Sequence, residues 1–327
     1  MSGRAGATIA DKVLRLLYGR REGFVARAEL GAVAGKAGAV EAALEALRQR
    51  GQELEESPGH GVRLVRPAGL DAGLIEHELG TQRVGRHVIC FGEVDSTNDV
   101  ARDGARQKHA DGLAVLAECQ RKGRGRLGRQ WISPARANVL MSVLLIDRER
   151  WLAHEAVTIA AGLAVAQAID EMLDLSCRLK WPNDVLIDGR KAAGVLVEVG
   201  GGRANRAVVI GVGINVNAAP DSAGLVQPAT CLAEQVGEAV ERIEVVRAVL
   251  RRLDEWVGCV QEKRLEELRA AWLGRCGMIH QRLTVESGGR RYVGRAEDIH
   301  PLEGLVLCGD HGERVHLPAE TSTILEE

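Results

Sequence analysis

The residues most able to do chemistry in this chain lie in an arginine-rich and glycine-rich stretch, residues 120–131. It reads Q-R-K-G-R-G-R-L-G-R-Q-W and contains five basic residues, three glycines and no acidic residue. Glycine lets the backbone bring N–H groups close to a ligand, and arginine supplies charge-assisted donors to phosphate or carboxylate. The stretch predicts an anion-binding loop, although its composition alone also fits a solvated or nucleic-acid-binding loop.

A second stretch, residues 179–199, predicts a β-hairpin. Apolar runs at 185–187 and 195–199 flank Asp188-Gly189, a pair that favours a two-residue turn with positive φ. Pro182 cannot donate a ladder hydrogen bond, so residues 181–184 are expected to bend at a strand entrance. The hairpin would then hold Lys191 on a fixed support, although a surface lysine and an ordinary turn would give the same local pattern.

A third stretch, residues 208–217, reads V-V-I-G-V-G-I-N-V-N and predicts a buried strand that meets a Gly-x-Gly. It lacks the third glycine and the following helix of a dinucleotide-binding fingerprint, so no Rossmann site is expected. Glycines at a crowded strand end are the simpler explanation.

In this order and spacing, the three stretches resemble the biotin protein ligase family. The matching segments are G-R-G-R-L-G-R-Q-W at 123–131, K-W-P-N-D at 180–184, R-K-A-A-G at 190–194, G-V-G-I-N at 211–215, and D-S-T-N at 95–98. The resemblance spans almost the whole chain. It implies ATP-dependent conversion of biotin to biotinyl-5′-AMP and transfer of biotin to a lysine of a biotin carboxyl carrier protein, such as a subunit of acetyl-CoA carboxylase.

The resemblance also implies roles for individual residues. The catalytic residues would be Lys191, Arg126 and Asp184, and Asp184 would also hold Mg²⁺. Biotin would contact Ser96, Thr97, Asn98, Gln120, Arg124, Gly125, Arg126 and Lys191. ATP would contact Arg129, Trp131, Asn183, Asp184 and Asn215.

Two other functions remain open. Lipoate–protein or octanoate–protein ligases share the central fold, but the arginine loop and the K-W-P-N-D segment followed by Lys191 favour biotin. A DNA-binding transcriptional regulator that responds to biotin would need a basic recognition helix. The helix expected at 36–49 instead exposes mostly alanine, with Glu41 and Glu45 opposing the phosphates, and residues 1–65 hold ten Lys and Arg against eight Asp and Glu.

The resemblance implies a multidomain α+β protein. We expect a winged helix-turn-helix domain at 1–66, a linker at 67–85, a mixed-sheet α/β ligase domain similar to class II synthetases at 86–275, and an SH3-like barrel at 276–327. Apolar periodicity predicts helices at 9–19, 26–34 and 36–49, two strands within 52–65, and a closing helical segment at 240–273. Four short strands are expected at 283–285, 292–295, 305–308 and 314–317. Members of the family can form a homodimer through the central sheet.

Composition fits this architecture. A chain of 327 residues exceeds the usual size of a single core, and a net charge of −2 does not favour nucleic acid or membrane binding overall. Seven cysteines without a C-x-x-C pair or a signal peptide predict reduced, mostly buried thiols and a cytoplasmic location. The longest uncharged helical stretch, residues 156–169, is expected to be a core helix too short to span a bilayer.

Overall fold

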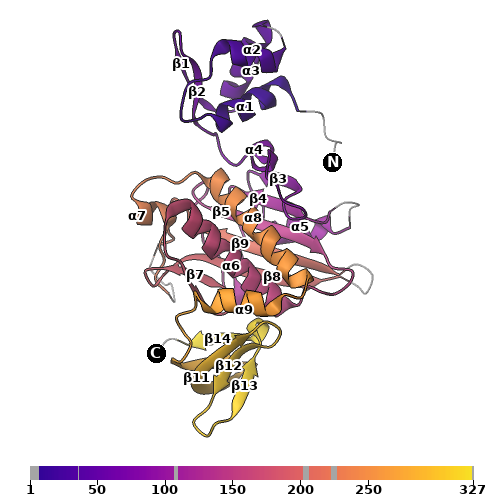
Figure 1. Cartoon of the computed structure of the whole chain (residues 1–327), viewed down its shortest axis with the longest axis vertical. Coiled ribbons are helices and arrows are strands. Elements are labelled where there is room, and N and C mark those ends of the chain that lie inside the picture. Colours follow the sequence, from indigo (N-terminus) through magenta and orange to yellow (C-terminus); the bar gives the residue numbers. More distant parts are fainter. Residues whose placement is uncertain (1–6, 36, 107–109, 202–205, 222–226, 326–327) are drawn as a thin grey trace. The chain divides into compact units, whose positions relative to one another are not determined.

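The computed structural model describes residues 7–35, 37–106, 110–201, 206–221 and 227–325. The chain forms two compact units, Met1–Glu78 and Leu79–Glu327. Most of their helices and strands are labelled in Figure 1. The predicted linker at 67–85 spans this division and contains a short helix, α4 (Ala72–Glu76), whose first turn is capped by Asp71.

The first unit consists of helices followed by a hairpin. Its elements are α1 (Ile9–Gly19), α2 (Arg27–Ala34), α3 (Ala37–Gln49), β1 (Glu53–Ser57) and β2 (Gly61–Arg66). Thr8 and Asp11 form a capping box at the start of α1, and the apolar faces of the three helices bury Val13, Leu30 and Leu44 completely. These three helices and two strands confirm the pattern expected from the sequence.

The second unit contains a mixed sheet of seven strands in the order β3-β4-β5-β9-β8-β7-β6. β3 and β4 are parallel, whereas the other neighbours are antiparallel. The strands are β3 (His87–Phe91), β4 (Leu113–Ala117), β5 (Val139–Ile146), β6 (Arg178–Lys180), β7 (Asp184–Ile187), β8 (Arg190–Gly200) and β9 (Ala207–Ile214). The predicted central mixed sheet is confirmed.

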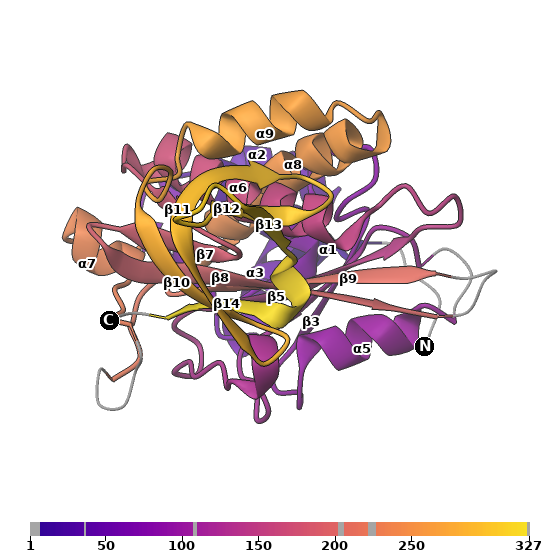
Figure 2. The same ribbon diagram turned by 90° about the horizontal axis from the view of Figure 1, so that it is seen from below.

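Helices cover both faces of this sheet. Figure 2 shows α6 (His154–Leu173), α8 (Arg242–Gln261) and α9 (Leu265–Leu273) on one side and α5 (Thr97–Gly104) on the other. The predicted closing helical segment is divided, because Lys263 adopts a left-handed φ of 59° between α8 and α9. A further short helix, α7 (Leu232–Val236), follows β9.

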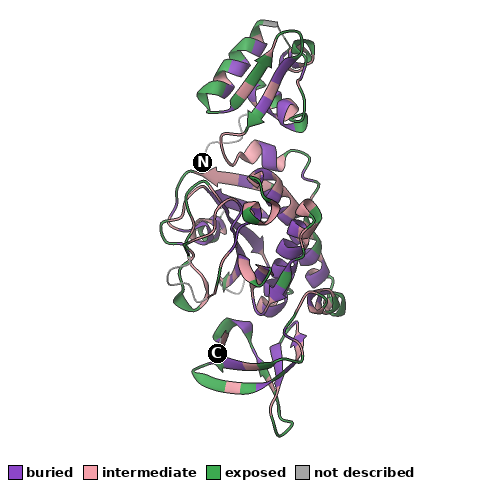
Figure 3. Ribbon diagram, turned by 90° about the vertical axis from the view of Figure 1, so that its left-hand side faces the viewer, coloured by how far each residue is buried: buried purple, intermediate pink, exposed green. Residues whose placement is uncertain are grey.

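Helix α6 has 20 residues, so the expectation that this segment is too short to span a bilayer was wrong. In the part of the chain that the structure describes, α6 is the one helix that is long and apolar enough to cross a membrane by length and composition. However, 72% of its most apolar 18-residue segment is buried inside the protein. Figure 3 shows the buried residues concentrated in the sheet and in the helices that pack on it. A helix that is apolar all round is expected where neighbours cover every side, which supports the predicted role as a core helix.

The end of the chain folds into a five-stranded antiparallel sheet in the order β13-β12-β11-β10-β14. Its strands are β10 (Arg282–Ser287), β11 (Arg290–His300), β12 (Gly304–Cys308), β13 (Arg314–Leu317) and β14 (Ser322–Leu325), with a 3₁₀ turn at Ala319–Thr321 before the last. Four of these strands were expected from the sequence, and β14 was not.

All seven cysteines are free thiols. Cys177, Cys231 and Cys259 are buried, while the other four are half-buried, so the prediction of mostly buried cysteines was too strong. Burial raises the pKa of the Cys177 and Cys276 thiols, which keeps them protonated at neutral pH.

Candidate active site

A pocket of about 410 Å³ opens at one end of the central sheet. Every predicted site residue except Asn215 lines it, namely Ser96, Thr97, Asn98, Gln120, Arg124, Gly125, Arg126, Arg129, Trp131, Asn183, Asp184 and Lys191. They come from the start of α5, the loop after β4, the turn between β6 and β7, the first residue of β7, and strand β8. The structure therefore gathers residues that are spread over almost a hundred positions of sequence.

The arginine loop closes on itself. The Gly125 N–H donates to Arg129 O at 2.8 Å, and the Trp131 N–H donates to Gly123 O at 3.0 Å. Between these bonds, residues 126–128 form a 3₁₀ turn in which Leu127 has a φ of 51°. Leu127 is 54% exposed, so the turn points an apolar side chain outward while its arginines reach the pocket.

Glycines of the sheet make room for two predicted site residues. A Cβ atom on Gly213 would lie 2.5 Å from the Trp131 ring, and one on Gly194 would lie 3.1 Å from the same ring. A Cβ on Gly211 would lie 2.4 Å from Asn98 Oδ1. The Gly-x-Gly at the end of β9 is thus a steric requirement of the pocket, as a crowded strand end predicts.

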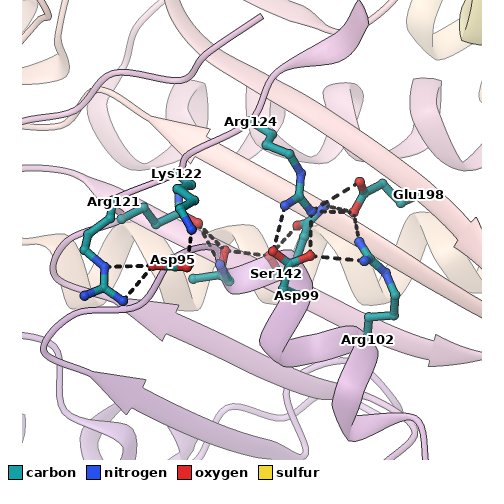
Figure 4. Close-up of polar contacts among 11 residues, drawn as sticks. Asp95, Asp99, Arg102, Arg121, Lys122, Arg124, Ser142 and Glu198 are labelled. Atoms are coloured by element: carbon teal, nitrogen blue, oxygen red, sulfur yellow. Dashed lines mark hydrogen bonds and ion pairs between the residues drawn. The ribbon is translucent and has the colours of Figure 1, made fainter. Parts of the chain in front are cut away.

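Three cations of the loop region are already paired with carboxylates. Arg121 and Lys122 contact Asp95 at 2.6 and 2.9 Å, and Arg124 contacts Asp99 at 2.7 Å (Figure 4). The hydrogen bond from Arg124 holds the pKa of Asp99 below its usual value. The positive charge of these side chains is therefore balanced within the protein.

Arg126 and Arg129 have no carboxylate at ion-pair distance within the described ranges. Arg126 Nη2 donates to Ser322 O at 2.6 Å and to Ala319 O, and Arg129 Nη2 donates to Thr323 Oγ1 at 3.3 Å. Burial lowers the pKa of Arg126 to about 10, so it stays a cation at neutral pH. A desolvated guanidinium without a counter-ion donates strong charge-assisted hydrogen bonds to an anionic ligand.

Lys191 lies in the same pocket on the β7–β8 hairpin, whose turn residues Asp188 and Gly189 both have positive φ as predicted. Its Nζ is 2.6 Å from Asp184 Oδ1 and 5.6 Å from the centroid of the Trp131 ring. The residue is held by its backbone, because the Lys191 N–H donates to Pro228 O at 2.8 Å. The hairpin thus presents the ammonium group at a fixed position.

Asn215 lies outside the pocket lining and is only 2% exposed. Its Nδ2 donates to Thr230 O at 3.1 Å and to Lys191 O at 3.5 Å. These bonds join the end of β9 to the chain segments that flank Lys191. Contact with ATP stays a prediction for Asn215, and its observed bonds support the backbone behind Lys191.

The pocket contains residues that the sequence did not single out. Among these are Met141, Lys180, Gly194, Gly213, Gln227, Thr323 and Ile324. Lys180 belongs to the K-W-P-N-D segment, so its position could have been inferred. Thr323 and Ile324 belong to β14, a four-residue strand without a clear alternating pattern.

Asp184 is the one carboxylate that lines the pocket in the part of the chain that the structure describes. Mg²⁺ bound beside a polyphosphate commonly takes one or two protein carboxylates and fills its other positions with phosphate oxygens and water. The donor set of the pocket therefore fits Mg²⁺ bound together with a phosphate ligand. No group of three or more His, Cys, Asp or Glu residues suited to a metal occurs among the described residues.

Comparison with known proteins agrees with this pocket. A model of the biotin/lipoate A/B protein ligase family matches residues 91–215. The biotin--[acetyl-CoA-carboxylase] ligase of Mycobacterium tuberculosis is 35% identical over 76% of this chain and 93% of its own length. The chain belongs to the biotin protein ligase family.

The chain is also similar to a second curated protein and to a solved structure of the biotin protein ligase family. The bifunctional ligase/repressor BirA of Bacillus subtilis is 35% identical over 63% of this chain, and the match spans 65% of that relative's length. The solved structure of the Aquifex aeolicus biotin protein ligase in complex with biotin and ATP is 28% identical, with a TM-score of 0.64 over 73% of this chain and 99% of that one.

Proposed function

We propose that the protein is an ATP-dependent biotin–[biotin carboxyl carrier protein] ligase. It would convert biotin to biotinyl-5′-AMP and pass the biotinyl group to a lysine of the carrier. The observation that carries the proposal is a single pocket that gathers Lys191, Arg126, Arg129, Trp131 and Asp184. The Mycobacterium tuberculosis relative is a biotin--[acetyl-CoA-carboxylase] ligase, and the Aquifex aeolicus structure holds biotin and ATP, which supports the same chemistry.

The first step joins two anions. A carboxylate oxygen of biotin bonds to the α-phosphorus of ATP, the bond to the bridging oxygen breaks, and pyrophosphate leaves. Fixed cations lower the cost of bringing these anions together and of the charge that develops between them. Lys191 and Arg126 would contact the reacting groups, and Arg129 would hold the nucleotide phosphates. Residues 96–98, Gln120, Arg124 and Gly125 would hold biotin.

In the second step, the ε-amine of the carrier lysine bonds to the acyl carbon and AMP leaves. The free amine has a pKa of about 10.4, so a proton must leave before or during the attack. Asp184 is the pocket carboxylate available to accept this proton. To do so it would give up its ion pair with Lys191, whose Nζ lies 2.6 Å from Asp184 Oδ1. Trp131, supported by Gly213, would cover the nucleotide.

Mg²⁺ would bind to Asp184 with the triphosphate, where it neutralises phosphate charge. Asn183 precedes Asp184 and is held by two hydrogen bonds. Its Nδ2 donates to Val195 O at 2.6 Å, and its Oδ1 accepts from Arg126 Nη1 at 3.4 Å. These bonds orient the turn that carries Asp184. The neighbouring residues thus restrict the directions in which the carboxylate can face.

The direct test is exchange of labelled pyrophosphate into ATP, with biotin, lipoate, octanoate or no acid added. We expect exchange with biotin and Mg²⁺ and background exchange with the other acids. Exchange with lipoate or octanoate instead would identify the protein as a member of the sister class. Transfer is then measured with a biotin carboxyl carrier domain and its acceptor Lys→Arg variant.

The arrangement of elements supports a winged helix-turn-helix fold for residues 1–66 and an SH3-like fold for residues 276–327, around a ligase domain resembling class II synthetases at 86–275. We also propose a cytoplasmic location, where ATP and carrier proteins are available. A homodimer through the central sheet is a further part of the proposal and is tested by sedimentation with and without biotin and ATP.

The first unit is not expected to bind DNA at physiological salt. Its helices α2 and α3 carry arginines whose charge is balanced, since Arg27 of α2 pairs with Glu41 and Glu56, and Arg48 of α3 also pairs with Glu56. Phosphate binding needs unpaired cations, and its strength falls steeply with salt. Fluorescence anisotropy with duplex DNA should show no binding.

A double variant, Glu41→Gln with Glu45→Gln, serves as the positive control for that measurement. It removes two negative charges from the exposed face of α3 and should increase weak, salt-sensitive binding. Tight binding by the unmodified protein to a specific duplex at physiological salt would instead support a regulator that also acts on DNA.

Gly213→Ala should weaken ATP binding. The new Cβ would lie 2.5 Å from the Trp131 ring, so the ring must move from its place beside Lys191. We expect the KM for ATP to rise about 10-fold, corresponding to the ~1.4 kcal/mol of one lost good contact. Gly200→Ala, whose Cβ meets nothing within 4 Å, is the matched control. An unchanged KM for ATP in Gly213→Ala would show that Trp131 does not contact the nucleotide.

A further inference from the structure

Two carboxylates beside the pocket hold two arginines in place (Figure 4). Arg124 donates to both oxygens of Asp99 at 2.7 and 2.8 Å, and its Nη2 lies 3.3 Å from Glu198 Oε2. Arg102 on α5 donates to the same Glu198 oxygen at 2.7 Å. A two-point contact fixes the plane of a guanidinium, so Arg124 has a defined orientation before a ligand binds.

Glu198 also fixes an amide of the pocket. Asn98 Nδ2 donates to Glu198 Oε2 at 2.8 Å, and Asn98 is only 4% exposed. This contact settles which end of the Asn98 amide faces β8. Glu198 therefore orients two predicted biotin-binding side chains, Asn98 and Arg124, by direct hydrogen bonds.

A fully buried hydroxyl continues the chain of contacts. Ser142 Oγ on β5 lies 2.6 Å from Asn98 Oδ1 and 2.7 Å from Thr97 Oγ1. Thr97 in turn donates to Gln120 Oε1 through its backbone N–H at 2.7 Å and its hydroxyl at 3.0 Å. One connected set of hydrogen bonds thus runs from Glu198 to Gln120.

Two residues of this hydrogen-bonded set, Ser142 and Glu198, do not line the pocket. Ser142 and Glu198 lie behind it, whereas Thr97, Asn98, Gln120 and Arg124 line it. Ser142 has one hydroxyl proton, which it can donate to Asn98 Oδ1 or to Thr97 Oγ1, so removing the hydroxyl ends its contacts with both oxygens. Partly satisfied buried networks lose orientation as well as stability.

We propose that Glu198 and Ser142 are positioning residues for the acid-binding half of the pocket. They act through Asn98, Thr97 and Arg124 and have no contact of their own with the substrate. This inference rests on the proposed function, since it assigns the pocket side chains that they orient to biotin. The nucleotide side, with Arg129 and Trp131, is not connected to this set by the hydrogen bonds described above.

The test compares Michaelis constants in biotin-dependent pyrophosphate exchange. Glu198→Ala and Ser142→Ala should each raise the KM for biotin about 10-fold, as expected when a buried hydrogen bond is lost, while the KM for ATP stays within about twofold. The kcat at saturating biotin should also be retained. Glu198→Gln, which keeps an oxygen acceptor for Asn98 Nδ2, should restore part of the affinity lost in Glu198→Ala.

Two matched controls separate positioning from general stability. Asp298, like Asp99, makes a two-point contact with an arginine, here Arg269, and its side chain is 26% exposed against 29% for Glu198. Thr158 has a buried hydroxyl, 2% exposed against 0% for Ser142. Asp298→Asn and Thr158→Val should leave the KM for biotin unchanged.

The outcomes are distinct. If the unmodified protein shows biotin-dependent exchange and both alanine variants keep its KM for biotin, the positioning role is wrong and the proposed function stands. Equal increases in the KM for ATP and for biotin would show a structural role and also overturn the inference. No biotin-dependent exchange in the unmodified protein would remove the proposed function and this inference with it. If Ser142→Ala does not fold, as judged by circular dichroism, the comparison of Glu198→Ala with Glu198→Gln tests the positioning role.

Discussion

Lys191→Ala is expected to lower the rate of biotin-dependent pyrophosphate exchange by on the order of 100-fold to 1,000-fold, the usual effect of removing a donor at developing charge. The lysine is fixed by its hairpin backbone and lies 2.6 Å from the pocket carboxylate Asp184. Because alanine leaves Asp184 without its ion-pair partner, it also places an uncompensated negative charge where two anions must meet. The measurement is exchange at saturating biotin and ATP.

The neighbouring arginine provides the control for Lys191. Arg190 is in the same hairpin but pairs with Glu234 at the surface, at 2.5 Å. Arg190→Ala should retain most of the exchange activity. Equal losses in the two variants would indicate damage to the hairpin, and full activity of Lys191→Ala would exclude the lysine from the reacting centre.

Arg126→Gly should make the enzyme release its activated intermediate. Arg126 ties the arginine loop to the carbonyl oxygens of Ala319 and Ser322, so glycine removes both a pocket cation and the attachment of the loop. An acyl-adenylate that is no longer enclosed can diffuse away and react with exposed lysines. We expect biotin on an added bystander protein to increase at least about 10-fold, given the 1–3 kcal/mol of a lost buried hydrogen bond.

Leu127→Gly is the matched control for that experiment. It adds a glycine to the same turn, at a residue that already has a φ of 51° and is 54% exposed, but it keeps the guanidinium. Bystander biotinylation by Leu127→Gly should stay at the level of the unmodified protein. The enclosure hypothesis fails if Arg126→Gly modifies only the proper carrier lysine.

The sequence predicted those helices and turns that depend only on neighbouring residues in the chain. The hairpin turn at Asp188-Gly189 was readable because few residues accept positive φ, and the first three helices followed from apolar periodicity. The family resemblance named twelve of the residues that line the pocket, but not Met141, Thr323 or Ile324. The sequence predicted a crowded strand end at Gly213, but it did not predict that the Trp131 ring is the group that leaves no room for a side chain there.

Contacts between residues that are far apart in the chain could not be predicted from the sequence. Glu198 is 74 positions from Arg124, and which carboxylates meet the loop arginines depends on the register of β8 in the sheet. The neutralisation of Arg124 by Asp99 and Glu198 could not be read from a basic loop that contains no acid. Asn215 shows the same limit, because a matched motif residue lies behind the pocket instead of in it.

Strand β14 contributes Thr323 and Ile324 to the pocket, and the carbonyl oxygens of Ala319 in the preceding turn and of Ser322 at the start of the strand accept the hydrogen bonds of Arg126. During translation these residues are made after all the other residues of the pocket. Domains fold as the chain emerges from the ribosome, yet the pocket cannot be completed until this strand pairs with β10. A nascent chain therefore lacks the complete pocket, and with it the site proposed here for forming the acyl-adenylate, until its synthesis has passed β14.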